Sequence, residues 1–249
     1  MSTLFISDLH LSAERPEKLE AFKFLLTDVA SQFESIYILG DLFEEFWVGD
    51  DDRTPPNPEI LSNLKSCTDS GVQVFFIRGN RELLLQSCFR DQTGVTVLAD
   101  ISEITVAGKK TLIMHGDQLC TLDSKYQLFR TIMTNNLVQF LIRILPYGFR
   151  TRLAHGLRPG MTRHKDTKTS EMLDVDQSAV TTIMNKHNAS ILIHGHTHKP
   201  GIHHFRLHNE PAKRIVLGDW YGKGEILVYT EDKFELMCIE DVLSKFKPN

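Results

Sequence analysis

The feature that most constrains this chain is a short apolar run that ends at a carboxylate, Ile36-Tyr37-Ile38-Leu39-Gly40-Asp41. Four apolar residues are too few for a helix and fit a strand that is buried on both faces. Because Gly40 permits a sharp turn, we expect Asp41 to lie at the carboxyl end of that strand. The same order of apolar and then polar residues recurs at 4–10, 74–81, 112–117 and 191–198. Five buried strands are therefore predicted to bring Asp, His and Asn side chains to one edge.

Predicted helices alternate with these strands. The segments 17–33 and 59–70 carry apolar residues at helical spacing, and a short helix is predicted over 82–89. Three short strands near the end are expected to pair antiparallel with the first sheet, and they lie at 214–217, 225–230 and 234–239. This alternation predicts an α/β fold. A chain of 249 residues with 41% hydrophobic content is large enough for one core, so we expect a single domain over 1–249.

Cysteine usage and the absence of a leader segment indicate the compartment. The four cysteines are far apart, form no Cys-x-x-Cys pair and follow no secretory signal, which is typical of a reducing cytosol. The longest apolar stretch, 137–149, is too short to span a bilayer and contains Arg143 and Pro146. We therefore expect a cytoplasmic protein.

Charge is distributed unevenly along the chain. The segment 123–170 holds nine Lys and Arg against two Asp, a charge of +7, while the whole chain carries −4, so the remainder carries −11. Apolar residues at 126–145 recur at three- and four-residue intervals, which predicts one or two amphipathic helices. This segment is either a helical hairpin that packs on the body, or a basic apolar cap that takes acyl chains and meets anionic lipid headgroups. Nucleic acid is disfavoured as a partner, because an acidic body repels a phosphate backbone.

Seven polar side chains at the predicted strand ends have the donor types of a metal site. Asp8 and His10 are one residue apart, as are His196 and His198, and in extended backbone such pairs point the same way. Carboxylate, amide and imidazole donors without thiolate suit Mn²⁺, Fe, Zn²⁺ or Mg²⁺. Seven ligands exceed the need of one ion, so we predict two divalent ions bridged by Asp41, with a water of lowered pKa between them. The predicted ligands are Asp8, His10, Asp41, Asn80, His115, His196 and His198.

The remaining histidines have a simpler interpretation. Asp-x-His alone says little, since a strand-end histidine can simply hydrogen-bond to the backbone. Gly-His-Thr-His is a stronger signal, and the ordered set of five motifs is the strongest indication of metal. His194 belongs to a strand interior. The others lie away from strand ends and are predicted to be surface residues: His155, His164, His187, His203, His204 and His208.

Taken together, the motifs from Asp8 to His198 resemble those of the calcineurin-like metallophosphoesterases. The resemblance implies two mixed β-sheets flanked by helices, with a dinuclear site at the strand ends and Mn²⁺ as the expected metal. It places Asp8, His10, Asp41 and His198 on one ion. It places Asp41, Asn80, His115 and His196 on the other. The catalytic residues that it implies are Asp41, Asn80, Arg81 and His115.

Within that family the chain is most similar to the bacterial members that cleave UDP-2,3-diacylglucosamine in lipid A synthesis, which also have Arg after the Asn, as Arg81 here. The similar stretches are 40–44, 49–52, 79–81, 114–117, 119–121 and 193–198. The resemblance implies release of UMP and 2,3-diacylglucosamine 1-phosphate, by attack on the phosphorus next to uridine. It also implies a UDP-linked diacylated glucosamine lipid as partner, and peripheral binding to the anionic cytoplasmic face of the inner membrane.

The same resemblance assigns substrate contacts, several of them in the segment 123–170. Met161 and Lys165 stand where the family has serine and asparagine, while Lys168 matches the family's lysine. The expected contacts are Asn80, Arg81, Asp123, Met161, Lys165, Lys168 and His196.

Arg81 also has a physical interpretation. A guanidinium stays charged and is a poor general acid, so the leaving group must be good already. A phosphate monoester has a conjugate acid with pKa about 6, against about 16 for a water-like alkoxide, which favours a diphosphate substrate. Two alternatives remain: another dinuclear-metal phosphodiesterase or nucleotide pyrophosphatase, which needs no basic apolar cap, and a non-catalytic binding module, which would be expected to lose ligands.

Overall fold

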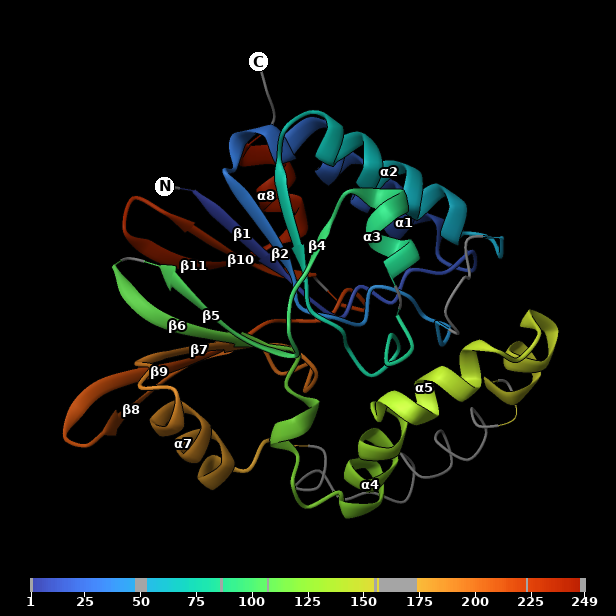
Figure 1. Cartoon of the computed structure of the whole chain (residues 1–249). Coiled ribbons are helices and arrows are strands. Elements are labelled where there is room, and N and C mark those ends of the chain that lie inside the picture. Colours follow the sequence, from blue (N-terminus) through green and yellow to red (C-terminus); the bar gives the residue numbers. More distant parts are fainter. Residues whose placement is uncertain are drawn as a thin grey trace.

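The structure is a computed structural model that describes residues 2–47, 53–85, 87–106, 108–154, 156, 174–222 and 224–246. Two β-sheets pack face to face, with helices on both outer sides (Figure 1). Buried side chains of both sheets, among them Phe5, Leu39, Ile113 and Ile193, fill the space between the sheets. This is the predicted fold of two mixed sheets flanked by helices.

The first sheet has the strand order β11-β10-β1-β2-β3-β4. Strands β1 to β4 are parallel, and β10 and β11 add an antiparallel hairpin beside β1. The core strands are short and almost wholly apolar, as expected of parallel strands covered on both faces. Their bounds are Thr3–Ile6 (β1), Ser35–Ile38 (β2), Gln73–Phe76 (β3), Thr96–Val97 (β4), Glu225–Thr230 (β10) and Lys233–Cys238 (β11).

The second sheet has the order β5-β6-β7-β9-β8, with β6, β7 and β9 parallel and the two edge strands antiparallel. The prediction that 214–217 pairs with the first sheet was wrong. That segment belongs to β9, which pairs with β7, because the β8–β9 hairpin folds back onto the strand before it. The bounds are Ile101–Val106 (β5), Lys109–Met114 (β6), Ile191–His194 (β7), Gly201–Leu207 (β8) and Glu210–Val216 (β9).

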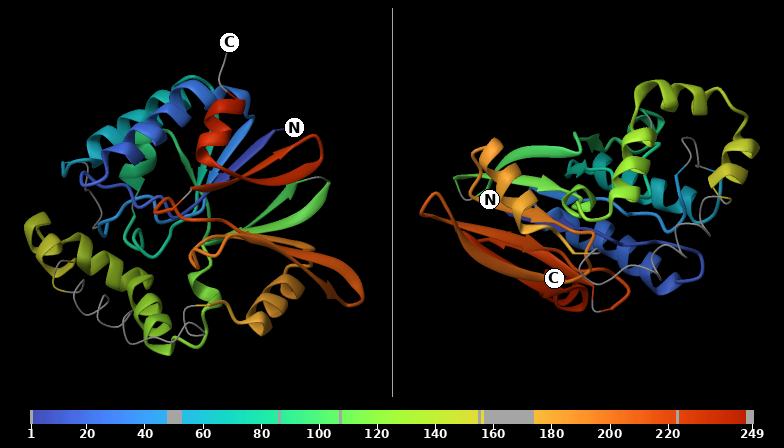
Figure 2. Two further views of the ribbon diagram at one scale, coloured as in Figure 1. Left: turned by 180° about the vertical axis from the view of Figure 1, so that it is seen from behind. Right: turned by 90° about the horizontal axis from the view of Figure 1, so that it is seen from below.

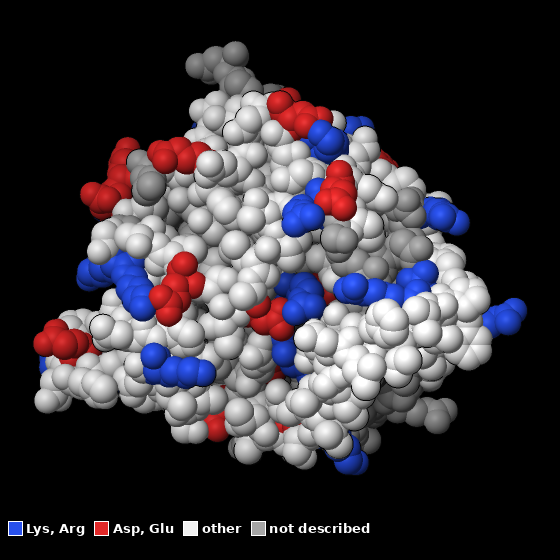
Figure 3. All heavy atoms as spheres, in the orientation of Figure 1, with Lys and Arg blue, Asp and Glu red and all other residues white. Residues whose placement is uncertain are grey.

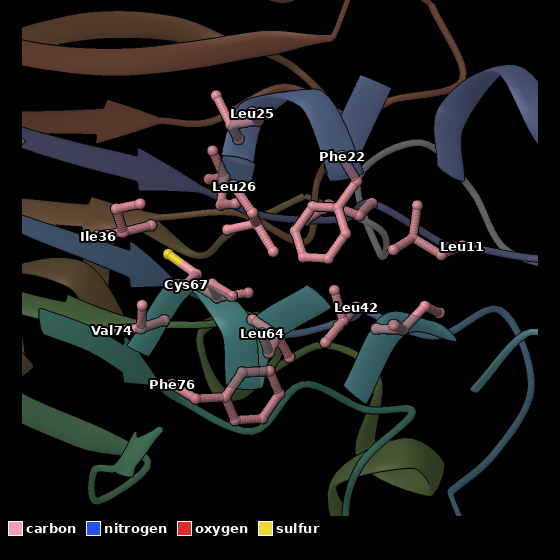
Figure 4. Close-up of a cluster of buried hydrophobic side chains, with 14 of the residues drawn as sticks. Leu11, Phe22, Leu25, Leu26, Ile36, Leu42, Leu64, Cys67, Val74 and Phe76 are labelled. Carbon is pink, nitrogen blue, oxygen red and sulfur yellow. The ribbon is translucent and has the colours of Figure 1, made fainter. Parts of the chain in front are cut away.

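Helices cover the outer face of each sheet. Over the first sheet lie α1 (Pro16–Phe24), α2 (Asn57–Asp69) and α8 (Ile239–Lys245), and over the second lies α7 (Gln177–Lys186). Figure 4 shows how side chains of α1, α2 and the strands gather in the first of these cores. The helix predicted over 17–33 is present, although its winding changes to a π-turn at Leu25–Val29.

The helix predicted over 82–89 begins later, as α3 (Ser87–Thr93). Its expected first residue, Glu82, is instead held in the preceding loop, where its carboxylate accepts hydrogen bonds from three backbone N–H groups. Because Glu82 is buried and hydrogen-bonded in that loop, it does not form the first turn of the predicted surface helix.

The segment from residue 123 forms a helical arm, called the cap here for residues 123–154. It contains α4 (Ser124–Met133), α5 (Asn136–Arg143) and helical residues 147–154, so the predicted amphipathic helices are present. Gln139 Nε2 donates to the Leu83 carbonyl oxygen at 3.0 Å, and the Thr54 and Tyr147 hydroxyls lie 2.8 Å apart. These contacts fix the cap at one end of the molecule, away from β8 and β9 (Figure 2).

The cap carries most of the exposed large apolar side chains found in the described parts of the chain. They are Leu128, Ile132, Leu137, Phe140, Leu141, Ile144, Phe149 and Leu153. Within the described residues, none of the helices combines the length and the hydropathy that crossing a bilayer requires.

Candidate metal centre

The loops that follow five strands meet at one point, and they bring all seven predicted ligands together. Asp8 and His10 follow β1, Asp41 follows β2 and Asn80 follows β3, while His115 follows β6 and the pair of His196 and His198 follows β7. Asp8 Oδ1 lies 3.3 Å from His198 Nε2, and Asn80 Oδ1 lies 3.1 Å from His115 Nε2. The first sheet thus supplies four of these side chains and the second sheet three.

Backbone conformation turns these side chains inward. Asp8, His10, Asp41, His196 and His198 all have positive φ, between 48° and 71°. The prediction that the i, i+2 pairs converge through extended backbone was therefore wrong, since left-handed turns bring them together. Positive φ is uncommon outside glycine, and such strain is concentrated at functional sites, where each residue costs about 1–3 kcal/mol.

Two glycines permit the loops to approach one another. A Cβ atom on Gly79 would lie 2.3 Å from Asp41 Oδ1, and one on Gly195 would lie 2.2 Å from Asp8 Oδ2. Any larger residue at either position would displace a predicted ligand, so the glycines of Gly-Asn-Arg and Gly-His-Thr-His are part of the centre.

Hydrogen bonds orient the ligand atoms. Asp8 Oδ2 accepts from the His196 N–H at 2.8 Å and from the Ser7 hydroxyl, which leaves Oδ1 to face the other ligands. His115 Nδ1 lies 2.8 Å from the Leu39 carbonyl oxygen, so that nitrogen carries the proton and Nε2 faces Asn80. Such outer contacts fix both the ring orientation and the tautomer of a ligand.

Three further acidic residues, none of them among the predicted ligands, support the centre. Glu82 is fully buried and binds the N–H groups of Asp41, Phe43 and Gly79. Asp219 Oδ2 lies 2.8 Å from His198 Nδ1, and Glu44 Oε2 lies 3.5 Å from His10 Nδ1. Glu82 directly follows Gly-Asn-Arg and Glu44 ends Gly-Asp-Leu-Phe-Glu, which was a signal of their position. Asp219 had no such signal.

Electrostatics in the centre favour a cation. Burial lowers the pKa of His115, but the carboxylates of Asp41, Asp8 and Asp117 outweigh it and raise that pKa to about 9. Burial and the positive charge on His115 lower the pKa of His196 to about 3. The buried carboxylates therefore draw one positive charge into the site, and a divalent cation would satisfy them better than a proton.

The donor set fits divalent cations. Ligand atoms of Asp8, His10 and His198 lie within 4.8 Å of one another, as do those of Asp8, Asp41 and His115. Asp8 Oδ1 is buried and accepts no hydrogen bond. Asp41 has one oxygen 3.7 Å from His10 Nε2 and the other 3.6 Å from His115 Nε2, so it faces both halves of the centre. Mixed carboxylate and imidazole donors are the chemistry of a catalytic metal site.

The predicted substrate residues have different locations. Arg81 lies beside the centre, where its N–H donates to Asp41 Oδ1 at 3.0 Å and its guanidinium lies over Phe46. Asp123 is 4% exposed and caps α4 by accepting the Tyr126 N–H at 3.2 Å. Met161, Lys165 and Lys168 lie outside the described residues.

An apolar pocket separates the cap from the body next to the centre. Its cavity volume is about 30 Å³, and Arg81 contributes to its wall. Most of the other lining side chains are apolar, and they come from both sides: Phe46, Trp47, Leu83, Phe129, Met133, Ile142 and Leu153.

The basic residues of the cap are not equally accessible. Arg130 is bound by Asp117 and Asp100, at 2.7 and 2.8 Å, and Arg150 is only 6% exposed. Residues 124–154 contain no Asp or Glu. In Figure 3 the surface at the lower right, where Figure 1 shows α5, is mostly uncharged with scattered Lys and Arg. The exposed cations of this region are Lys125, Arg143 and Arg152.

Known proteins share this sequence over most of its length. The profile of the calcineurin-like phosphoesterase family matches residues 1–200. A UDP-2,3-diacylglucosamine hydrolase of Vibrio vulnificus is 43% identical over 236 residues, covering 95% of this chain and 97% of that protein. The enzyme of the same name from Salmonella arizonae is 43% identical over 238 residues, covering 96% and 99%. Among solved structures, the E. coli phosphoesterase Yfce aligns over 97% of this chain and 94% of its own, with 15% identity and a TM-score of 0.49.

Proposed function

The chain belongs to the calcineurin-like phosphoesterase family and is a hydrolase, and we propose that it cleaves UDP-2,3-diacylglucosamine to UMP and 2,3-diacylglucosamine 1-phosphate. One observation supports this substrate: Arg81 lines the apolar pocket and also donates its N–H to Asp41 in the cluster of candidate metal ligands. A diphosphate at the cluster would therefore have its lipid portion next to apolar side chains of the cap.

We assign the ligands as the resemblance implies. Asp8, His10, Asp41 and His198 would hold one divalent ion, and Asp41, Asn80, His115 and His196 the second, with Mn²⁺ as the proposed metal. Such ions would supply positive charge to the phosphate and would lower the pKa of a bound water to a value near neutral pH. The position of Asp41, with its two oxygens facing His10 and His115, supports its role as the shared ligand.

The protein's own groups have distinct roles in this reaction. Arg81 remains charged, and its fork is suited to bind oxygens of the phosphate that leaves with the lipid. Its backbone N–H meanwhile holds Asp41 in place. Asn80 and His196, which lie within 3.2 Å of His115 Nε2, are the proposed neighbours of the attacked phosphate. Asp123, Met161, Lys165 and Lys168 remain proposed contacts of the sugar and its phosphate.

The cap is proposed to hold the acyl chains and to bind the cytoplasmic face of the inner membrane peripherally. Burial of an acyl chain contributes about 0.8 kcal/mol per CH₂. The exposed apolar residues of α5 share the stretch 124–154, which contains no carboxylate, with Arg143 and Arg152, and this suits an anionic lipid surface. Each such cation near the membrane surface is worth about 1 kcal/mol.

A substrate panel tests the function. Protein loaded with Mn²⁺ is incubated with UDP-2,3-diacylglucosamine and with unacylated UDP-sugars, and the products are identified by mass. We expect UMP from the acylated substrate and much slower cleavage of the others. In water labelled with heavy oxygen, the label should enter UMP, as attack on the phosphorus next to uridine requires. Equal cleavage of all the diphosphates would instead favour a general nucleotide pyrophosphatase.

A further inference from the structure

Two cations lie against one aromatic ring beside the candidate metal centre. The Arg15 guanidinium carbon is 3.9 Å from the centroid of the Tyr221 ring, and Lys18 Nζ is 4.0 Å from it. The Tyr221 hydroxyl is in turn bound by the Glu44 carboxylate, which fixes the ring. We call Arg15, Lys18 and Tyr221 the basic–aromatic cluster.

The cluster presents hydrogen-bond donors that have no acceptor. Lys18 is only 8% exposed, yet its Nζ has no hydrogen-bond partner among the described residues. Burial, and then the charge of Arg15, lower the pKa of this amine to about 8. The Arg15 guanidinium forms neither a hydrogen bond nor an ion pair with the described part of the chain. Buried donors without acceptors are unfavourable, so the cluster suits a ligand that supplies hydrogen-bond acceptors.

The nearby carboxylates are already engaged. Glu44 binds the Tyr221 hydroxyl, and Asp219 faces His198 and accepts the Tyr221 N–H at 3.0 Å. Neither carboxylate forms a direct ion pair with the two cations, although the charges of Asp219, Glu17 and Glu44 partly offset the fall in the pKa of Lys18.

The cluster and the cap approach different ligands of the metal centre. The Tyr221 ring is 5.1 Å from the ring of His10 and 6.2 Å from that of His198. Tyr126 of α4 faces His196 instead, with ring centroids 6.4 Å apart. A substrate with a diphosphate at the centre has two arms, and the cap accounts for only one of them.

Resting on the function proposed above, we propose that the basic–aromatic cluster is the subsite for the nucleoside arm of the substrate, where Arg15 and Lys18 donate to the carbonyl oxygens of uracil. The ribose spans the interval between the centre and the cluster, past His10. Uracil offers two carbonyl acceptors, whereas cytosine replaces one of them with an amino donor. Donors that reach both carbonyl oxygens therefore prefer uridine to cytidine, because the cytosine amino group would face a donor instead of an acceptor.

Calorimetric titration of the Mn²⁺-loaded protein tests this assignment. UMP, CMP and inorganic phosphate are titrated into the wild type and into the double variant Arg15→Met, Lys18→Met, whose side chains keep the apolar contact with Tyr221. The matched control removes two distant cations from α2 and α3, as Lys65→Met with Arg90→Met. One lost hydrogen bond to a charged donor corresponds to about a tenfold weaker Kd.

We expect the wild type and the control to bind UMP more tightly than CMP and more tightly than phosphate. In the cluster variant, the preference for UMP over phosphate should fall at least tenfold, and most of the preference for UMP over CMP should be lost. An unchanged preference in the cluster variant would overturn the subsite, as would a wild type that does not distinguish UMP from CMP. If the proposed function itself is wrong, the wild type releases no UMP from UDP-2,3-diacylglucosamine. That result does not depend on which nucleotides the protein binds, so the two failures can be told apart.

Discussion

Glu82 provides the sharpest test of how the centre is held together. Its two carboxylate oxygens accept three backbone N–H groups, from Asp41 and Gly79 at 3.0 Å and from Phe43 at 3.1 Å. These bonds join the loop after β2 to the loop after β3. The residue touches no substrate, so its removal tests the positioning of the Asp41 loop alone.

The size of the effect follows from the number of bonds. A buried N–H left without an acceptor costs about 1–3 kcal/mol, so Glu82→Ala, with three of them, should lose about 3–9 kcal/mol of unfolding free energy. Native domains have only about 5–15 kcal/mol in total, so that variant should be barely folded. Glu82→Gln keeps one carbonyl oxygen for the Asp41 and Gly79 N–H groups and turns its amino group toward Phe43. It should therefore lose about 1–3 kcal/mol.

Urea denaturation of both variants, followed by circular dichroism and paired with metal analysis, measures these losses. Glu82→Gln should fold and bind metal with reduced affinity, while an exposed matched change, Glu210→Gln, should have no effect. If Glu82→Ala unfolds at the same urea concentration as the wild type, the three hydrogen bonds do not hold the two loops together.

Three further outcomes are expected. Asp41→Ala should abolish hydrolysis and reduce bound metal with the fold intact, and full metal occupancy measured in that variant would remove the bridging role. Metal-free protein should lose thermal stability as pH rises from 6.5 to about 9. In the folded state the pKa is raised to about 8 for Glu82 and to about 9 for His115, so the stability that their protonated forms provide is lost as each group deprotonates. A melting temperature that rises over this interval would contradict this prediction. Arg143→Glu with Arg152→Glu should reduce cosedimentation with anionic liposomes at low salt, and equal binding by wild type and variant would exclude these cations from membrane contact.

The strand-end motifs predicted the fold and the members of the candidate centre because each motif follows a buried strand. What they could not predict is how each loop turns. Asp8 and His198 converge through left-handed backbone, which a two-residue spacing does not reveal. The partner of β9 also had no sequence signal, since its apolar pattern suits either sheet.

The charge of +7 on the segment 123–170 overstates the positive charge that the cap exposes. Arg130 contributes to the +7 of the segment 123–170, but two carboxylates neutralise it. Arg150 contributes as well, although it is buried. Asp100 and Asp117 precede the segment, so a count confined to it could not include the charges they cancel.

The division of the ligands between the two sheets has a consequence for how the protein matures. During synthesis, Asp8, His10, Asp41 and Asn80 leave the ribosome long before His196 and His198, which complete the set from the second sheet. A chain that ends before His196 therefore has only five of the seven predicted ligands. Tight binding of the proposed ions would therefore require that one sheet has docked on the other, and the bound metals would then link two parts of the fold that separate segments of the chain have built.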